Sequence, residues 1–320
     1  MLKKRTACPL LFVVLAMILA FPAPAVTQSP TGGDSGTPAR PVTIPLTIKV
    51  KGNAAERETE LQIVDLALTE DGEPQSILSV RAFGTNSPIS LAVLIQDDVV
   101  SSISNEIAGI RQFVRKLPKG SKVMIGYVRA GSLQVRQRFT TDLERAAKAL
   151  RVPLGVASAA PYNPYVEVIE ALRRFDSQPS GRRALLLVSD GLDTSRGLDS
   201  TSATQSLDLQ RAINESQRRG VAVYAFYAPT VLALRSPILA GDAQSSLLRL
   251  SDETGGQAFF QGTGVPVSFD PFIRDLNLAL ERQVALTYLS THLNKGFHRV
   301  QVRSSAPGVE LSYPTGYSRN

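Results

Sequence analysis

The sequence predicts an α/β protein, with a mostly parallel, doubly wound central sheet, helices on both of its faces, and a small β element beside it. The central sheet is predicted by short apolar runs that alternate with amphipathic helical stretches over about 190 residues. Such runs lack period-two alternation, as expected of strands covered on both faces. The β element is predicted by two outer segments, 42–88 and 284–320, in which apolar and polar residues alternate.

The overall composition is that of a globular protein. The chain has 320 residues, of which 43% are hydrophobic and 20% charged, which argues against disorder and against a multi-span membrane protein. A single cysteine and two histidines are too few for a thiolate zinc site or a histidine-built metal centre. The net charge is +7, but no basic stripe with interleaved aromatic residues is present, so we expect no nucleic-acid partner.

The first 25 residues have the pattern of a secretory signal peptide. A basic start at 3–5 precedes an apolar run at 10–20 and an Ala-Pro-Ala cleavage pattern at 23–25. We expect cleavage after Ala25 and an exported protein, periplasmic or secreted, with no stable membrane span afterwards. Retention as a membrane anchor is the rival interpretation, although the apolar run is short for a span. Residues 26–41, rich in Pro, Gly, Ser and Thr, are expected to be a flexible linker.

The segment 42–88 is expected to form strands. Residues 42–50 alternate strictly, and two further strand candidates at 61–68 and 76–83 flank a tight turn at 70–73.

The segment 89–283 is expected to form the α/β domain. A helix at 103–117, with an apolar residue at every third or fourth position, follows the first buried strand, and Ser102 or Ser104 could cap it. The expected strands are 91–95, 122–128, 133–139, 184–188, 221–226 and 257–260, and the further helices are 142–150, 165–175, 207–219, 243–253 and 270–282.

The segment 284–320 returns to strand patterns at 284–290 and 298–303, around a turn at 294–296. Neither outer segment could stand alone as a sheet, so we expect them to pack together. The two histidines, His292 and His298, flank the turn and are expected to be exposed.

Acidic residues follow two of the expected buried strands. Asp97 and Asp98 come after the first, and Asp190 comes after the strand at 184–188. Ligands of open α/β sheets bind outside the carboxyl ends of the strands, so we take these three aspartates as candidate binding residues. The alternative is structural: Asp97 and Asp98 would cap the following helix, and Asp190 would cap a turn.

Four segments, in order, resemble the von Willebrand factor type A domain, in a secreted bacterial branch of that family. They are 64–77 (VDLALTEDGEPQSI), 184–191 (ALLLVSDG), 250–259 (LSDETGGQAF) and the strands from Tyr288 onward. The resemblance covers most of residues 60–317. It implies a non-catalytic protein-binding module, for adhesion or scaffolding, whose partner completes the shell of a magnesium ion.

The sequence departs from the metal motif of that family, which is Asp-x-Ser-x-Ser, a Thr from a middle loop and a later Asp. Aligning the strand ends places Gln96, Asp98 and Val100 at the first three positions, and no register supplies all three oxygens. Tyr162 or Asn163 lies nearest to the missing Thr, and only Asp190 carries over cleanly. We therefore expect a degenerate site, in which Asp97 and Asp98 could compensate to hold Mg²⁺.

Two other function classes remain open. The same acidic residues, Asp97, Asp98 and Asp190, could serve a metal-dependent hydrolase, although no phosphate clamp of Lys or Arg follows them. The β element could instead offer an edge strand to another protein. We favour an exported, non-enzymatic module that binds a protein partner of unknown identity at the carboxyl rim of the sheet.

Overall fold

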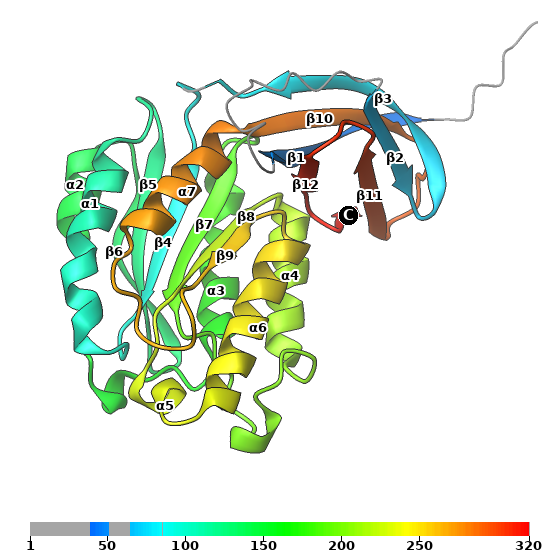
Figure 1. The fold of residues 1–320 in the computed structure, drawn as a ribbon. Coiled ribbons are helices and arrows are strands. Elements are labelled where there is room, and N and C mark those ends of the chain that lie inside the picture. Colours follow the sequence, from blue (N-terminus) through cyan, green and yellow to red (C-terminus); the bar gives the residue numbers. More distant parts are fainter. Residues whose placement is uncertain (1–38, 51–64, 85, 320) are drawn as a thin grey trace, which may run out of the picture. The chain divides into compact units, whose positions relative to one another are not determined.

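A computed structural model describes residues 39–50, 65–84 and 86–319 (Figure 1). The expected signal peptide and most of the expected linker lie outside these ranges, as does the first half of the strand expected at 61–68. The end of that linker is part of a strand that begins at Arg40. Among the described residues, no helix has both the length and the apolar character needed to cross a membrane.

The α/β part is built on a six-stranded sheet in the order β6-β5-β4-β7-β8-β9. All neighbours are parallel except β6, which forms an antiparallel hairpin with β5. The chain moves outward from β4 in one direction and then from β7 in the other, so the strand order reverses between these two strands. The six strands are β4 (Ser90–Gln96), β5 (Lys122–Arg129), β6 (Ser132–Thr140), β7 (Arg183–Ser189), β8 (Ala222–Tyr227) and β9 (Gln257–Phe259).

Helices cover both faces of this sheet, which explains the unbroken apolar runs of its central strands. In β4, Leu91, Val93 and Ile95 point to the face covered by α1, α2 and α7, and Ala92 and Leu94 point to the face covered by α3, α4 and α6. The helices are α1 (Ile107–Arg115), α2 (Leu143–Ala149), α3 (Pro164–Arg173), α4 (Leu207–Arg219), α5 (Val231–Leu234), α6 (Pro237–Glu253) and α7 (Asp270–Glu281).

Two expectations about helix starts are wrong. The expected cap at Ser102 or Ser104 is absent: a 3-10 helix occupies Ser101–Glu106, and the residue before it, Val100, makes no side-chain cap. Helix α6 begins at Pro237 rather than near 243, because Ser236 accepts a hydrogen bond from the backbone N–H of Leu239 and proline suits the first turn.

The outer segments form a seven-stranded antiparallel sheet, which has more strands than the α/β sheet and is not the small element expected. Its order is β12-β1-β10-β3-β2-β11-β13, so strands from both outer segments are mixed within it. Val42, Ile44, Leu46 and Leu286 are among its core residues. The strands are β1 (Arg40–Val50), β2 (Leu66–Glu70), β3 (Glu73–Ala82), β10 (Gln283–Ser290), β11 (Gly296–Ser304), β12 (Val309–Ser312) and β13 (Gly316–Arg319).

The two histidines are buried or half-buried in this sheet, contrary to expectation. His298 Nδ1 lies 2.8 Å from Asp71 Oδ2, and its Nε2 lies 2.8 Å from the carbonyl oxygen of Asn294. His292 Nδ1 lies 3.8 Å from the fully buried carboxylate of Glu70. Glu70 is the last residue of β2 and Asp71 lies in the turn after it, and the pairing of β2 with β11 brings both carboxylates to the histidines.

Hydrogen bonds join the antiparallel sheet to the end of α6 and to the residue before β9. The backbone N–H of Thr315 donates to the carbonyl of Glu253 at 3.1 Å, and Ser312 Oγ donates to the carbonyl of Gly256 at 3.0 Å. These contacts lie at the amino ends of the parallel strands. The opposite, carboxyl ends are therefore left clear of the antiparallel sheet.

Candidate functional site

We call the carboxyl edge of the α/β sheet the rim. It includes the loops that follow β4, β7, β8 and β9 and the loop between α2 and α3. The backbone N–H of Val100 donates to the carbonyl of Pro229 at 3.0 Å, and that of Gly155 donates to the carbonyl of Asp97 at 2.9 Å. Between these loops lies a small pocket of about 200 Å³, the rim pocket. Its lining consists of Gln96, Asp98, Gly155, Ala157, Ala160, Pro161, Asp190, Leu192, Thr194, Thr230, Val231 and Leu232.

Asp190 lies on the floor of the rim pocket and is almost completely buried. Its Oδ2 accepts a hydrogen bond from the Thr230 hydroxyl at 2.6 Å, and its Oδ1 accepts one from the backbone N–H of Leu192 at 3.1 Å. Burial raises the pKa of Asp190 from 3.8 to about 6, although these hydrogen bonds oppose the change. The bond to Leu192 holds a turn, as the structural alternative expected.

Asp98 is the second carboxylate of the rim pocket. Its Oδ1 accepts a hydrogen bond from Gln96 Nε2 at 2.9 Å, and the other end of that amide, Gln96 Oε1, accepts one from the Ser189 hydroxyl. Burial raises the pKa of Asp98, the bond from Gln96 lowers it, and the charge of Asp97 raises it further. The polar groups on the pocket floor therefore bond to one another.

Asp97 belongs to a different contact. It does not line the rim pocket. The Arg151 guanidinium donates hydrogen bonds to both of its carboxylate oxygens at 2.7 Å, and the backbone N–H of Leu154 donates to Oδ1 at 3.0 Å. The Arg151 guanidinium also lies 4.0 Å from the centre of the Tyr127 ring. Asp97 thus anchors the loop after α2. Neither Asp97 nor Asp98 caps the following helix, so that structural alternative is wrong for this pair.

The residues of the rim do not fit the magnesium site that the family resemblance implies. Val100 offers no ligand atom, and Asn163 is used to cap α3, since its Oδ1 accepts from the backbone N–H of Tyr165. Only Asp98 and Asp190 of the three candidate ligands share the pocket. Within residues 39–50, 65–84 and 86–319, no group of three or more His, Cys, Asp or Glu side chains could hold a metal ion.

The position of Gly191, directly after Asp190 at the end of β7, requires a glycine. Its φ of +76° is in the left-handed region, and a Cβ atom there would lie 2.6 Å from Leu247 Cγ on α6. Its carbonyl accepts a hydrogen bond from the buried hydroxyl of Tyr165 at 2.6 Å. This glycine therefore lets the Asp190 loop pack between α3 and α6.

Large apolar side chains are exposed on the rim, and the sequence analysis did not predict them as a group. The most exposed are Val267 at 93%, Ile238 at 75% and Tyr162 at 72% of their surface. Others on the same loops and helix starts are Val152, Leu154, Val156, Val166, Leu198, Val231 and Leu234. The signal was present in the sequence, where apolar residues recur in segments that carry the Pro and Gly typical of loops, such as 152–156.

Comparisons with known proteins give weak matches. No family model matches the sequence, and no curated protein matches it. Among solved structures, the chain is similar to BatB from Bacteroides thetaiotaomicron, with 15% identity and a TM-score of 0.32 over 43% of this chain and 65% of that one. It is also similar to an aerotolerance-related membrane protein from Bacteroides fragilis NCTC 9343, with 13% identity and a TM-score of 0.39 over 60% and 98% of the two chains.

A third similar structure is the VWA domain of SpRpn10, with 10% identity and a TM-score of 0.39 over 59% of this chain and 93% of that one. At such TM-scores these likenesses carry no weight for function. The α/β fold rests instead on the strand order and helix layers described above.

Proposed function

We propose that this chain is an exported, non-catalytic protein-binding module with a doubly wound, von Willebrand A-like domain. Its partner docks on the rim through apolar contacts. The observation that carries this proposal is the set of exposed apolar side chains on the loops around the rim pocket, led by Tyr162, Val231 and Ile238. Exposed apolar groups gathered at one end of a soluble domain mark interaction sites, whereas single ones scattered over a surface do not.

The rim pocket suits an apolar side chain of the partner at its mouth. Ala157, Ala160, Pro161, Val231 and Leu232 line it above the two carboxylates. The floor is already hydrogen-bonded within itself, so an apolar group can enter without stripping partners from the polar atoms there. Docking of the partner removes more water from Asp98 and Asp190, and this disfavours their ionised forms relative to their protonated forms. Binding should therefore tighten as the pH falls from 8 to 5.

Magnesium has no step in this proposal. The arrangement of Asp97, with both oxygens held by Arg151, removes one of the three expected ligands from the pocket. We propose that capture of the partner is unaffected by chelating agents. The same geometry gives the alternative, a metal-dependent hydrolase, no observation in its favour.

The proposal is tested by capture from an envelope extract with the mature chain, beginning at Val26, fixed to beads. The rim variants are Tyr162→Ser and Ile238→Ser, and the matched control is Leu248→Ser, which removes a partly exposed leucine elsewhere on α6. We expect both rim variants to lose at least nine-tenths of a protein that the wild type and the control both retain. Equal recovery of every captured protein by all four chains contradicts the rim as the binding surface.

A further inference from the structure

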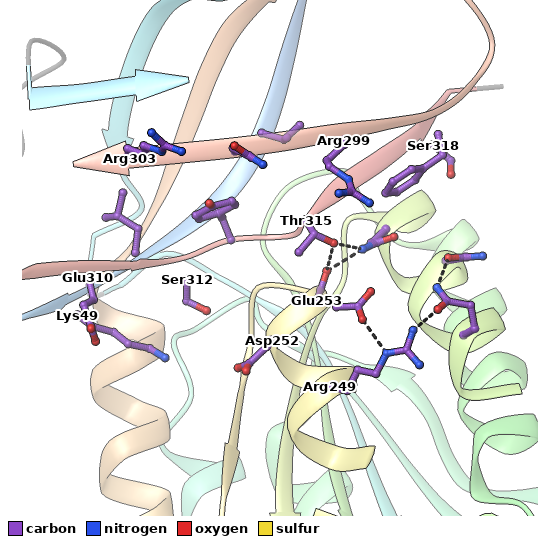
Figure 2. A pocket seen from close by; sticks show the side chains of 18 residues that line it. Lys49, Arg249, Asp252, Glu253, Arg299, Arg303, Glu310, Ser312, Thr315 and Ser318 are labelled. Atoms are coloured by element: carbon purple, nitrogen blue, oxygen red, sulfur yellow. Dashed lines mark hydrogen bonds and ion pairs between the residues drawn. The ribbon is translucent and has the colours of Figure 1, made fainter. Parts of the chain in front are cut away.

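A second, larger hollow lies at the opposite end of the α/β sheet from the rim. It measures about 1300 Å³ and separates α4 and the end of α6 from strands β11, β12 and β13 (Figure 2). Its floor is the junction where Thr315 and Ser312 bond to the residues before β9. We call this hollow the groove. Nothing in the proposed function uses it.

One wall of the groove is the outer face of β11. The strand turns His298, Val300 and Val302 toward the sheet core, and it presents the intervening side chains to the groove, which are Phe297, Arg299, Gln301 and Arg303. Figure 2 shows Arg299 and Arg303 on this strand, across the groove from the end of α6. Neither guanidinium forms an ion pair with any other residue that the structure describes.

The other charged groups of the groove are two cations, Lys49 and Arg249, and three carboxylates. Arg249 Nε donates to Glu253 Oε1 at 2.8 Å, and its Nη2 donates to Gln210 Oε1. Lys49 lies opposite Glu310 on the neighbouring strand, and its charge also acts on Asp252. Together with Arg299 and Arg303 the groove lining carries one positive charge in excess, and these two arginines place positive charge on the β11 wall.

The spacing of these two arginines matches an extended peptide. They are four residues apart on one face of a strand, which corresponds to about 13 Å. An extended chain beside β11 has the same repeat, so carboxylates at its positions i and i+4 fall opposite the two guanidinium groups. A compact anion could reach only one of them. Arginine forks favour carboxylate partners through paired hydrogen bonds.

The facing wall, on α4, carries amide groups that suit a peptide backbone. Gln210 Nε2 donates to Asn214 Oδ1 at 3.0 Å, which leaves the Asn214 NH₂ group available as a donor. One turn later, Gln217 Nε2 donates to the Glu253 carbonyl at 2.7 Å and to Thr315 Oγ1 at 3.0 Å. Because the Glu253 carbonyl can only accept, the orientation of this amide is fixed.

Gln217 is thereby left with an unused acceptor. Its side chain is 95% buried, and its Oε1 has no hydrogen-bond partner among the described residues. A buried acceptor without a partner carries a desolvation cost that a donor from a ligand removes. Asn214 and Gln217, three residues apart on one helix face, thus offer one donor and one acceptor, as a peptide C=O and N–H require.

We propose that the groove binds an extended acidic peptide segment of a partner protein, with its carboxylates on Arg299 and Arg303 and its backbone on Asn214 and Gln217. Phe297, exposed at one end of the β11 wall, contacts the aliphatic part of the peptide. The module then has two binding surfaces at opposite ends of the α/β sheet, an apolar one at the rim and a cationic one in the groove.

The test uses a fluorescein-labelled heptapeptide, Glu-Thr-Glu-Thr-Glu-Thr-Glu with blocked ends, and its counterpart with Gln in place of every Glu. Binding to the mature chain is followed by fluorescence anisotropy at pH 7. We expect the acidic peptide to bind at least tenfold more tightly than the Gln peptide. The double variant Arg299→Gln/Arg303→Gln should weaken the binding at least tenfold, and Asn214→Glu, at an exposed position, should weaken it through repulsion.

The matched control is Arg136→Gln/Arg138→Gln, which removes the same charge from the exposed face of β6 and should change the dissociation constant less than twofold. Three results overturn the proposal: no saturable binding of the acidic peptide by the folded wild type, equal binding of both peptides, or equal weakening by the control. Displacement of the peptide by an equal concentration of inorganic phosphate also overturns it, in favour of a small-anion site. Rim variants should leave all these values unchanged, so this test and the capture experiment fail independently.

Discussion

Replacing the buried Asp190 by asparagine should stabilise the protein, and the gain should grow with pH. Burial raises the pKa of Asp190 from 3.8 to about 6. The unfolded chain therefore ionises this group more easily than the folded chain does, and the fold loses stability as the pH rises from about 4 to 6. Above pH 7 the loss is complete and amounts to about 3 kcal/mol, since one pKa unit corresponds to about 1.4 kcal/mol.

Asparagine removes this titration and keeps much of the local geometry, because its Oδ1 can still accept from the backbone N–H of Leu192. Urea unfolding of wild type and Asp190→Asn at pH 4, 6 and 8 gives the free energy difference at each pH. We expect the difference to favour the variant by about 2.5 kcal/mol more at pH 8 than at pH 4. A constant offset from altered hydrogen bonds cancels in this comparison.

Asp199, exposed on the loop after β7, provides the control, since Asp199→Asn removes one charge without changing a buried group. Its free energy difference from wild type at each pH gives the effect of losing one surface charge, which is subtracted from that of Asp190→Asn. A difference between wild type and Asp190→Asn that stays flat, or that shrinks as the pH rises, refutes the assignment of Asp190 as a carboxyl whose ionisation opposes folding.

Three more perturbations test the structure away from the rim pocket. Burial raises the pKa of Glu167 to about 7, and both its carboxylate oxygens lack hydrogen-bond partners in the described ranges. The difference in unfolding free energy between Glu167→Gln and wild type should therefore favour the variant by about 2 kcal/mol more at pH 8 than at pH 5. Arg151→Ala leaves the buried carboxylate of Asp97 with only the more distant Arg129 as a cationic partner, whose Nε lies 4.0 Å from Oδ2, and should cost about 3 kcal/mol at pH 7 in a urea titration. A cost below 1 kcal/mol contradicts the anchoring role. Burial lowers the pKa of His298, but its hydrogen bonds to a backbone carbonyl and to Asp71 outweigh this and raise it above 6.5. Burial raises the pKa of Asp71, but its hydrogen bonds with His298 and with the backbone N–H of Arg299 outweigh this and lower it below 3.8. The stability that this pair contributes is present between about pH 4 and 6.5. It is lost above this range as His298 deprotonates and below it as Asp71 protonates. His298→Gln should lack this pH-dependent contribution, and equal pH profiles of unfolding free energy for wild type and variant contradict the pairing.

The buried strands and amphipathic helices could be predicted because burial on two faces leaves a plain pattern. Strand β7, whose residues 184–188 are all apolar, was placed within one residue at each end. Helix α4 begins and ends at the predicted residues 207 and 219, between a Ser cap and a left-handed Gly220. The short strands β12 and β13 were missed, because four half-buried residues carry too little alternation to be distinguished from a loop.

The candidate site was predicted in part. The sequence places Asp97, Asp98 and Asp190 after two buried strands. The structure shows that these strands, β4 and β7, are neighbours, and it brings Asp98 and Asp190 into one pocket. The direction of Asp97 could not be predicted, because it depends on Arg151, 54 residues later, whose guanidinium reaches back across the loop. The burial of His298 could not be predicted either, since the partner Asp71 lies in a turn that meets β11 only when both outer segments pair.

The most direct test of the rim as a binding surface is site-specific photo-crosslinking in the mature chain. A benzophenone amino acid replaces Tyr162 on the rim or, as control, Leu78 on β3, which is also partly exposed. After illumination in an envelope extract, a single covalent adduct should form from position 162 and not from position 78. Adducts from both positions alike, or from position 78 only, contradict a partner that docks on the rim.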